Sequence, residues 1–420
     1  MVTSLELVTL AFVLLLGSVS FVLLWIRTPR GARLGATIDR WGRRLSDRGD
    51  WSWLRWELIL LVCAAAYASV IGFDLAYGLY GCSGHGPSDI LGLVASGQAF
   101  LRGTDPFSVT NCGGTILVPY GFAVLGLDGI GSLGGAAGVA AVWGAVALAV
   151  VPLTWALAGP DRRYVTAVVA TSLLFLPLVS AQIDGATNAL VPAAVLLVAY
   201  LAARHEPLAA AVGGFLATGR FPALFPIAAG AGRFRRAVLG VVVAVGVFGG
   251  LTAVGYAVWG NAFLGPVFFE QLNRRSFSLN VFGLFGHQGW LPGGDGLAVG
   301  QAVLTVALVL VVWWRSRSVL GAMAITLAGV ALLTQFLSFN ILVSLVPVAL
   351  LGARPRWWLW GIAVVGTANY DLAYPYLGQQ AGVWWPYELL GIVLTGLLVG
   401  LFVDLWRGEL AAGRGAPTAS

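Results

Sequence analysis

Long apolar runs separated by short polar segments extend over almost the whole chain. Many of these runs approach the ~20 residues that a helix needs to cross the hydrocarbon core of a bilayer. The pattern therefore predicts an all-α, polytopic transmembrane protein with about 11 to 13 membrane helices. Single crossings are expected at residues 5–26, 58–73, 134–157, 164–180, 186–203, 237–259, 298–314, 357–374 and 387–405.

Two apolar segments have arginines near both ends and do not fit single crossings: Pro207 to Gly230 and Val319 to Leu351. The first is interrupted by Gly219-Arg220-Phe221-Pro222. Proline removes a helix hydrogen-bond donor and glycine weakens a helix, so we expect two short helices that meet at Arg220. We expect the second segment to be a hairpin that turns near Ser338 to Asn340.

Composition excludes two broad classes of protein. The chain has 420 residues, of which 59% are hydrophobic and 10% charged, and a mean hydropathy of +0.87. Soluble domains are about one quarter charged, so a soluble enzyme is excluded. The net charge of +6 comes from 24 basic residues, all arginine, that gather at the ends of apolar runs instead of forming one stripe. This distribution excludes a nucleic-acid-binding domain, and no nucleic acid partner is expected.

The arginines set the expected orientation, because positive residues concentrate in cytoplasmic loops. Eight of them lie between Arg27 and Arg55, directly after the run 5–26, which we expect to be a retained helix. The N-terminus is then outside and the C-terminus cytoplasmic. Residues 1–408 are expected to form a single transmembrane domain, and 409–420 a disordered cytoplasmic tail. Four arginines depart from the trend: Arg102, Arg274 and Arg275 lie outside, and Arg220 lies within the membrane.

Two long segments are expected on the extracytoplasmic side, at residues 74–133 and 260–297. Functional residues are often carried by such connecting segments, so we expect the site to face outward. In the first segment, apolar positions from Ile90 to Leu101 follow a helical period. Asp89 opens this juxtamembrane helix, Gly103 ends it, and Asp105-Pro106 prevents its continuation.

An aspartate that opens a juxtamembrane helix, with a Gly-x-Asp-Pro-aromatic stop whose aspartate follows sixteen residues later, resembles the first outer loop of GT-C glycosyltransferases. The resemblance is strongest to the polyprenol-phosphate-mannose-dependent mannosyltransferases of actinobacterial type. Val118-Pro119-Tyr120 is similar to the family's Tyr-Pro-Pro segment, although Gly121 follows the tyrosine here.

Two further stretches extend the resemblance over roughly residues 58 to 290. Ala181-Gln182-Ile183-Asp184 is similar to a Gly-Gln-x-Asn turn, with Ala for Gly and Asp for Asn. Gly219-Arg220-Phe221-Pro222 is similar to a Lys-x-x-Pro break, with Arg for Lys and the proline one place early. The C-terminal third departs from the family: a Ser-Pro-x-Ser-Trp-type segment is reduced to Leu337-Ser338-Phe339-Asn340.

The resemblance implies inverting transfer of a sugar, with a bias to mannose, from a polyprenyl phosphate to a glycolipid or glycan hydroxyl on the outer face of the cell membrane. Such a reaction needs a carboxylate that takes the acceptor proton, and cations that stabilise the leaving lipid phosphate. Asp89 is the candidate base, and Arg220, Arg274 and Arg275 are the candidate phosphate ligands. The partners implied are the lipid-linked donor, the acceptor and membrane lipids.

Each of these residues also has a structural interpretation. Asp89 has the side chain of a helix N-cap, and the two roles are compatible. An arginine within the membrane is costly, so Arg220 should face a cavity or a partner, either the phosphate or a carboxylate such as Asp184. Arg274 and Arg275 are alternatively a solvated interfacial pair, neutralised by Glu270.

Several polar residues are candidates for substrate binding, and each has a plain alternative. Asp105 is expected either to shape the turn before Pro106 or to touch the donor. Tyr120 is a candidate for stacking on sugar or prenyl chain, although interfacial tyrosines are common. Loop hydrogen bonding is the alternative role for the remaining candidates, which are Gln182, Asp184, Asn188, Asn280 and His287.

The cysteines and the missing motifs complete the sequence picture. Cys82 and Cys112 bracket the Asp89 helix and are candidates for a disulfide, which an oxidising exterior permits, whereas Cys63 lies in a span and should be unpaired. No zinc spacing, P-loop or dinucleotide fingerprint is present, and no cofactor is expected. Asp89, Asp105 and Asp184 could together hold a divalent metal that contacts the phosphate, but the resemblance to the mannosyltransferase branch implies that none is used. The alternative function is a transporter or flippase for a lipid-linked or small anionic solute, built on the same intramembrane Arg220.

Overall fold

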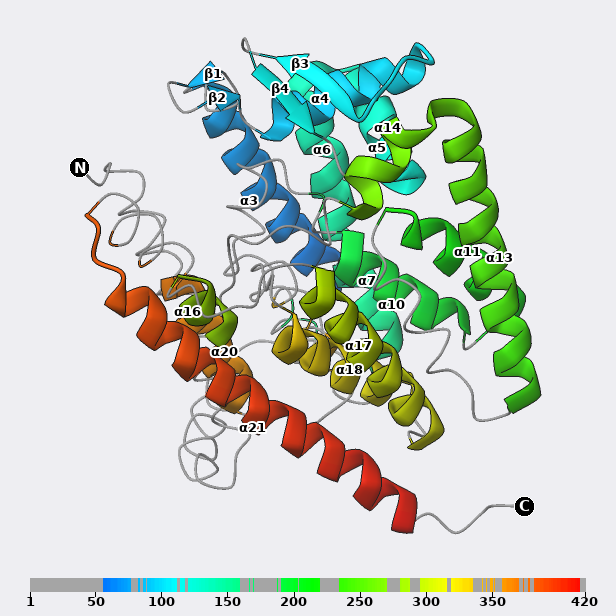
Figure 1. Cartoon of the computed structure of the whole chain (residues 1–420), viewed down its shortest axis with the longest axis vertical. Helices are drawn as coiled ribbons and strands as arrows, with labels where there is room; N and C mark the ends of the chain where they lie inside the picture. The colour runs from blue at the N-terminus through cyan, green and yellow to red at the C-terminus, as the bar shows by residue number, and fades with distance from the viewer. Residues whose placement is uncertain are drawn as a thin grey trace, which may run out of the picture.

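The computed structural model places each residue that is described below. These are residues 56–76, 82–83, 86–87, 89–111, 114–117, 120–158, 190–202, 204–219, 234–269, 280–287, 295–315, 319–334, 357–369 and 381–415, together with residues 166, 169, 187, 342, 345, 348, 349, 351, 373 and 377. Figure 1 shows their arrangement along the long axis of the molecule.

Helices make up nearly all of the described structure, which confirms the all-α prediction. In the first half they are α3 (Trp56–Ala76), α4 (Asp89–Leu101), α5 (Phe122–Ser132), α6 (Gly135–Leu148), α7 (Val150–Leu157), α10 (Leu190–Ala202) and α11 (Glu206–Ala217). In the second half they are α13 (Phe234–Trp259), α14 (Asn261–Leu264), η4 (Gly265–Phe269), α16 (Val281–His287), α17 (Asp295–Arg315), α18 (Val319–Leu333), α20 (Trp357–Thr367) and α21 (Trp385–Gly415).

Three of the described helical stretches are long and apolar enough to cross a membrane: Gly135–Leu157, Leu239–Trp259 and Trp385–Gly408. Shorter apolar helices of 10–17 residues accompany them in the described part of the chain. An integral membrane protein follows from this content, because apolar helices of this length satisfy their backbone hydrogen bonds internally and expose hydrocarbon to lipid. The second of these stretches, in α13, exposes Leu239, Val242 and Val254 on its surface.

Helix boundaries agree with several sequence expectations and correct others. The segment 207–230 does contain a short helix, α11, that ends before Arg220, and α18 forms the first arm expected for residues 319–351. The prediction of a disordered tail over residues 409–420 is wrong for residues 409–415, because α21 continues through Gly415. The Glu-Leu-Ala-Ala sequence that begins at Glu409 consists of strong helix formers, and it outweighs the glycines that follow.

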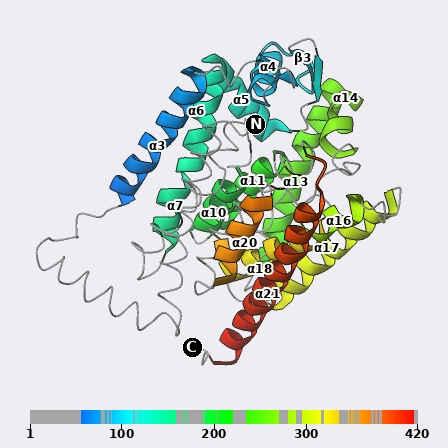
Figure 2. The same cartoon turned by 90° about the vertical axis from the view of Figure 1, so that its left-hand side faces the viewer.

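The segment 74–133 contains more structure than the one helix that its periodicity predicts. It forms two antiparallel hairpins, β1 (Cys82–Ser83) with β2 (Gly86–Pro87) and β3 (Ser108–Asn111) with β4 (Gly114–Leu117), as well as α4 and α5. These elements cap one end of the molecule in both views (Figures 1 and 2). We call this the α4 end.

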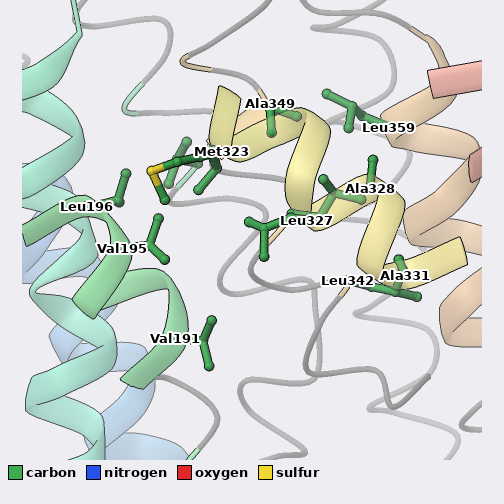
Figure 3. Packing of buried hydrophobic residues seen from close by; sticks show 14 of the residues in the cluster. Val191, Val195, Leu196, Met323, Leu327, Ala328, Ala331, Leu342, Ala349 and Leu359 are labelled. Carbon is green, nitrogen blue, oxygen red and sulfur yellow. The ribbon is translucent and has the colours of Figure 1, made fainter. Parts of the chain in front are cut away.

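The main core lies away from the α4 end. It joins apolar residues of α3, α7, α10, α18, α20 and α21 in one buried cluster. In Figure 3, Val195 and Leu196 of α10 lie opposite Met323 and Leu327 of α18. A second cluster under the α4 end joins α4, β3, α5, α6, α10 and α11. This second cluster positions the candidate site.

Candidate active site

The helix that opens with Asp89 ends as its sequence predicts. α4 spans Asp89–Leu101, and Gly103 follows with a positive φ of 71°, a conformation that favours glycine. The backbone N–H of Phe107 then donates to Asp105 Oδ1 at 2.8 Å, which makes Asp105 the turn residue that its position before Pro106 suggested. Asp89 thus stands at the first residue of α4; its side chain lies outside the described part of the structure.

Buried contacts hold α4 against its neighbours. Ile90, 1% exposed, belongs to a small cluster with Ala140 of α6, against which Ile71 of α3 also packs. Two turns later Gly97 meets the backbone of Asp128 in α5, so closely that a side chain on Gly97 would overlap the Asp128 carbonyl. α4 therefore rests on α5 and α6 along most of its length, and its first residue is fixed relative to both helices.

An aromatic cluster connects the α4 end to the end of α13. Trp259, the last residue of α13, lies edge-on to Phe107 at 5.5 Å between ring centroids. Phe107 packs in the same way on Phe263 of α14, at 5.3 Å, and Phe100 of α4 and Phe122 of α5 complete the cluster. The turn that follows α4 is therefore anchored to the second connecting segment, which begins directly after α13.

The end of α11 meets the start of α5 in a contact that we call the α5–α11 junction, formed by Gly121, Ala123, Thr218 and Gly219. The Thr218 hydroxyl accepts a hydrogen bond from the Ala123 backbone N–H at 3.0 Å and donates to the Phe215 carbonyl at 2.6 Å. Thr218 thereby satisfies one of the free first-turn amides of α5, for which Gly121 offers no side chain. One hydroxyl joins two segments that are 95 residues apart in sequence.

Glycines permit this close approach. A side chain on Gly121 would overlap the Thr218 carbonyl, and one on Gly219 would press on Ala123 and Val124 of α5 and on Leu190 of α10. The departure from the Tyr-Pro-Pro pattern at Gly121 therefore has a local reason in this fold. The close approach brings together Tyr120, Leu190 and Gly219, which belong to or flank the three sequence stretches that resemble family motifs.

One buried acid at the α4 end, Asp128, was not predicted from the sequence. Asp128 is 0% exposed and accepts a hydrogen bond from Trp143 Nε1 of α6 at 2.9 Å, and its other carboxylate oxygen is buried without a hydrogen-bond partner among the described residues. The signal was present in the sequence: Asp128 is the one charged residue of the segment 122–133. Its helical neighbours are apolar, but only the fold shows that the side chain points inward.

Asn280 makes contacts of a structural kind. It is 1% exposed, and its amide donates to the carbonyls of Ala331 and Thr334 at the end of α18. Its oxygen accepts from the Phe282 backbone N–H, which fixes the first turn of α16. Both amide hydrogens are thus engaged by backbone, in the loop-stabilising role that the sequence left open. His287 is the last residue of α16.

The remaining sequence candidates divide between described and undescribed positions. Tyr120 is half-buried and packs on the second cluster, Arg102 is exposed just past α4, and Cys63 is buried and free, as expected for a cysteine in a span. Candidates outside the described residues are Gln182, Asp184, Asn188, Arg220, Arg274, Arg275 and Cys112, and the same holds for the side chains of His287 and Cys82. The phosphate ligands and the Cys82–Cys112 pairing therefore stay predictions.

Comparison with known proteins places this architecture. Residues 116–339, more than half of the chain, match glycosyltransferase family 87, a group of GT-C type membrane glycosyltransferases. The match covers the α5–α11 junction and starts after α4, so it does not include Asp89. No curated protein matches the chain. The largely helical membrane fold agrees with this match, and a family match over more than half of its length shows that the chain belongs to glycosyltransferase family 87.

Proposed function

We propose that this glycosyltransferase moves mannose from a polyprenyl phosphate to a hydroxyl of a glycolipid or glycan on the outer face of the cell membrane. The family supports sugar transfer, and the arginine distribution supports an outward-facing α4 end. The observation that carries the proposal is the α5–α11 junction. Through it, the residue before Arg220 packs on α5, the helix that supports α4 and its first residue Asp89.

The reaction makes one bond and breaks one bond at the anomeric carbon. The acceptor oxygen attacks that carbon from the face opposite the lipid phosphate, so the configuration inverts and the carbon–oxygen bond to phosphate breaks. In the proposal Asp89 takes the acceptor proton as the new bond forms. Arg220, Arg274 and Arg275 stabilise the negative charge that develops on the departing polyprenyl phosphate. No divalent metal is required.

The remaining candidates have supporting roles in this proposal. Tyr120 stacks on the sugar or the prenyl chain beside the junction, and the turn before α10 offers Gln182, Asp184 and Asn188 to sugar hydroxyls. A membrane-embedded site suits such a donor, because the prenyl chain stays in lipid while the phosphate and sugar reach the polar end of the helices. The C-terminus is then cytoplasmic.

Transfer is measured with purified protein, radiolabelled polyprenyl-phosphate-mannose, a host lipid extract and a chelator. We expect label to move into a new glycolipid with inverted anomeric configuration. The same assay with polyprenyl-phosphate-arabinose identifies the sugar. Release of labelled donor to the opposite leaflet of proteoliposomes without any new glycosidic product would instead establish a flippase and overturn the proposal.

Donor titration tests the phosphate role of Arg220. Replacing Arg220 by alanine removes a charge-assisted hydrogen bond, so the KM for the donor should rise about tenfold or more while the KM for the acceptor stays the same. Arg102→Ala, at an exposed position past α4, is the matched control and should leave the donor KM unchanged. Equal donor KM values for the parent and Arg220→Ala would assign the phosphate to other residues.

A further inference from the structure

The buried carboxyl of Asp128 lies between the two helices that support α4. Its side chain reaches Trp143 of α6 and its backbone carbonyl meets Gly97 of α4. Trp143 is 2% exposed and belongs to the second cluster together with Leu93 of α4. One residue of α5 therefore touches both α6, which is part of a membrane-crossing stretch, and the helix that opens with the candidate base.

We propose that Asp128 is a positioning residue: its neutral carboxyl, held by Trp143, fixes α5 between α6 and α4 and so sets the position of Asp89. This proposal rests on the proposed function, in which Asp89 is the base. Asp128 does not reach the substrate in it, because the side chain is fully buried among helices. Its effect on the reaction passes through α4.

The neutral form follows from the surroundings. A buried carboxylate needs several hydrogen bonds or a paired cation, whereas in the described part of the chain Asp128 has one donor and an oxygen without a partner. α5 has eleven residues, about half of a span, and belongs to the connection between α3 and α6. Burial raises the pKa of Asp128 to about 8, and the Trp143 hydrogen bond offsets this only in part.

Charged groups on the neighbouring helices do not change the expectation that the Asp128 carboxyl is neutral. α6 has no titratable residue, and α4 has Asp89 at its first residue and Arg102 just past its last. α11 has Glu206 at the end away from the junction, and α13 has arginines near its start and Tyr256 exposed near its end. Asp128 itself is therefore expected to ionise as pH rises through about 8.

A second tryptophan–aspartate pair in the same chain provides a matched control. Trp358 Nε1 of α20 donates to Asp404 Oδ2 of α21 at 2.6 Å, far along the sequence from α4. Trp358→Phe removes the same kind of hydrogen bond between two other helices. A general loss of stability would follow from either tryptophan variant, whereas a loss of positioning should follow only from Trp143→Phe.

The test compares the parent, Trp143→Phe, Asp128→Asn and Trp358→Phe after size-exclusion chromatography. We expect Trp143→Phe to lower kcat about tenfold or more with an unchanged donor KM, since misplacing a catalytic group costs rate. Asparagine keeps an acceptor for Trp143 and stays neutral, so Asp128→Asn should keep the parent kcat. The parent kcat should fall as pH rises through about 8, and that fall should be absent in Asp128→Asn.

Hydrogen exchange of the α4 amides provides a readout that does not depend on activity. It should quicken in Trp143→Phe and stay at the parent rate in Trp358→Phe. Parent exchange rates and parent kcat in folded Trp143→Phe would overturn the positioning role, as would a folded Asp128→Asn enzyme that transfers no sugar. A parent that transfers no sugar would refute the proposed function instead, and α4 exchange would still decide whether Asp128 positions the helix.

Discussion

Asp89→Asn should reduce sugar transfer by about 10²- to 10⁴-fold, the range that general base catalysis contributes. In the proposed mechanism the amide cannot take the acceptor proton, so the hydroxyl must attack without a base. Asp89 is the first residue of α4, and asparagine has nearly the same helix propensity as aspartate, so the helix start should survive the change. α4 is in addition held by Ile90 and Gly97, so the variant should fold with the parent thermal midpoint.

The measurement is kcat for transfer at saturating donor, with donor KM and thermal midpoint determined on the same preparation. Asp105→Asn is the control in the same connecting segment. Its amide oxygen can still accept from the Phe107 N–H, so the turn and the rate should both be preserved. Equal rates for Asp89→Asn and the parent would leave Asp89 with a structural role at the start of α4 and assign the base to another residue.

Gly121→Ala should lower transfer about 100-fold and reduce thermal stability. The backbone at Gly121 has φ −88° and ψ −166°, which alanine adopts freely, so the penalty comes from space and not from conformation. The added methyl group would overlap the Thr218 carbonyl, which belongs to backbone and cannot rotate away. The α5–α11 junction must then open, and displacements of about 1 Å in an active site can cost about 10²-fold in rate.

Gly126→Ala is the matched control for this prediction. Gly126 lies in α5, the helix that Gly121 precedes, and a side chain there would meet nothing within 4 Å. Alanine should therefore leave the rate unchanged and hold or raise the thermal midpoint. Both variants are compared by thermal unfolding in detergent and by transfer kinetics. A Gly121→Ala protein with parent kinetics would show that the junction does not position the site.

Much of this fold could be predicted from the spacing of apolar residues and from the residues that begin and end helices. The start of α4 at Asp89 and its end before Gly103 follow from local rules, as does the end of α11 before Arg220. These rules act within a few residues, and the sequence displays them directly. The continuation of α21 past Glu409 was missed because the apolar pattern stops there while helix propensity does not.

Contacts between distant segments were not accessible in the same way. The sequence gives no sign that Thr218 caps α5, since its partner Ala123 is 95 residues away. The sequence likewise gives no sign that Asp128 is buried and bonded to Trp143, which lies on another helix. The roles proposed for side chains that contact substrate, such as Arg220 and Asn188, stay predictions from sequence pattern and family resemblance.

The two hydrogen bonds of Thr218 have a thermodynamic consequence. Because one hydroxyl ends α11 and begins α5, a movement of the chain after Thr218 also shifts the helix that supports α4. In the proposed reaction Arg220, which follows the α11 side of this contact, binds the donor phosphate. The α5 side supports α4, whose Asp89 acts on the acceptor. The binding free energies of donor and acceptor are then coupled. If bound donor raises the affinity for the acceptor by some factor, bound acceptor must raise the affinity for the donor by the same factor.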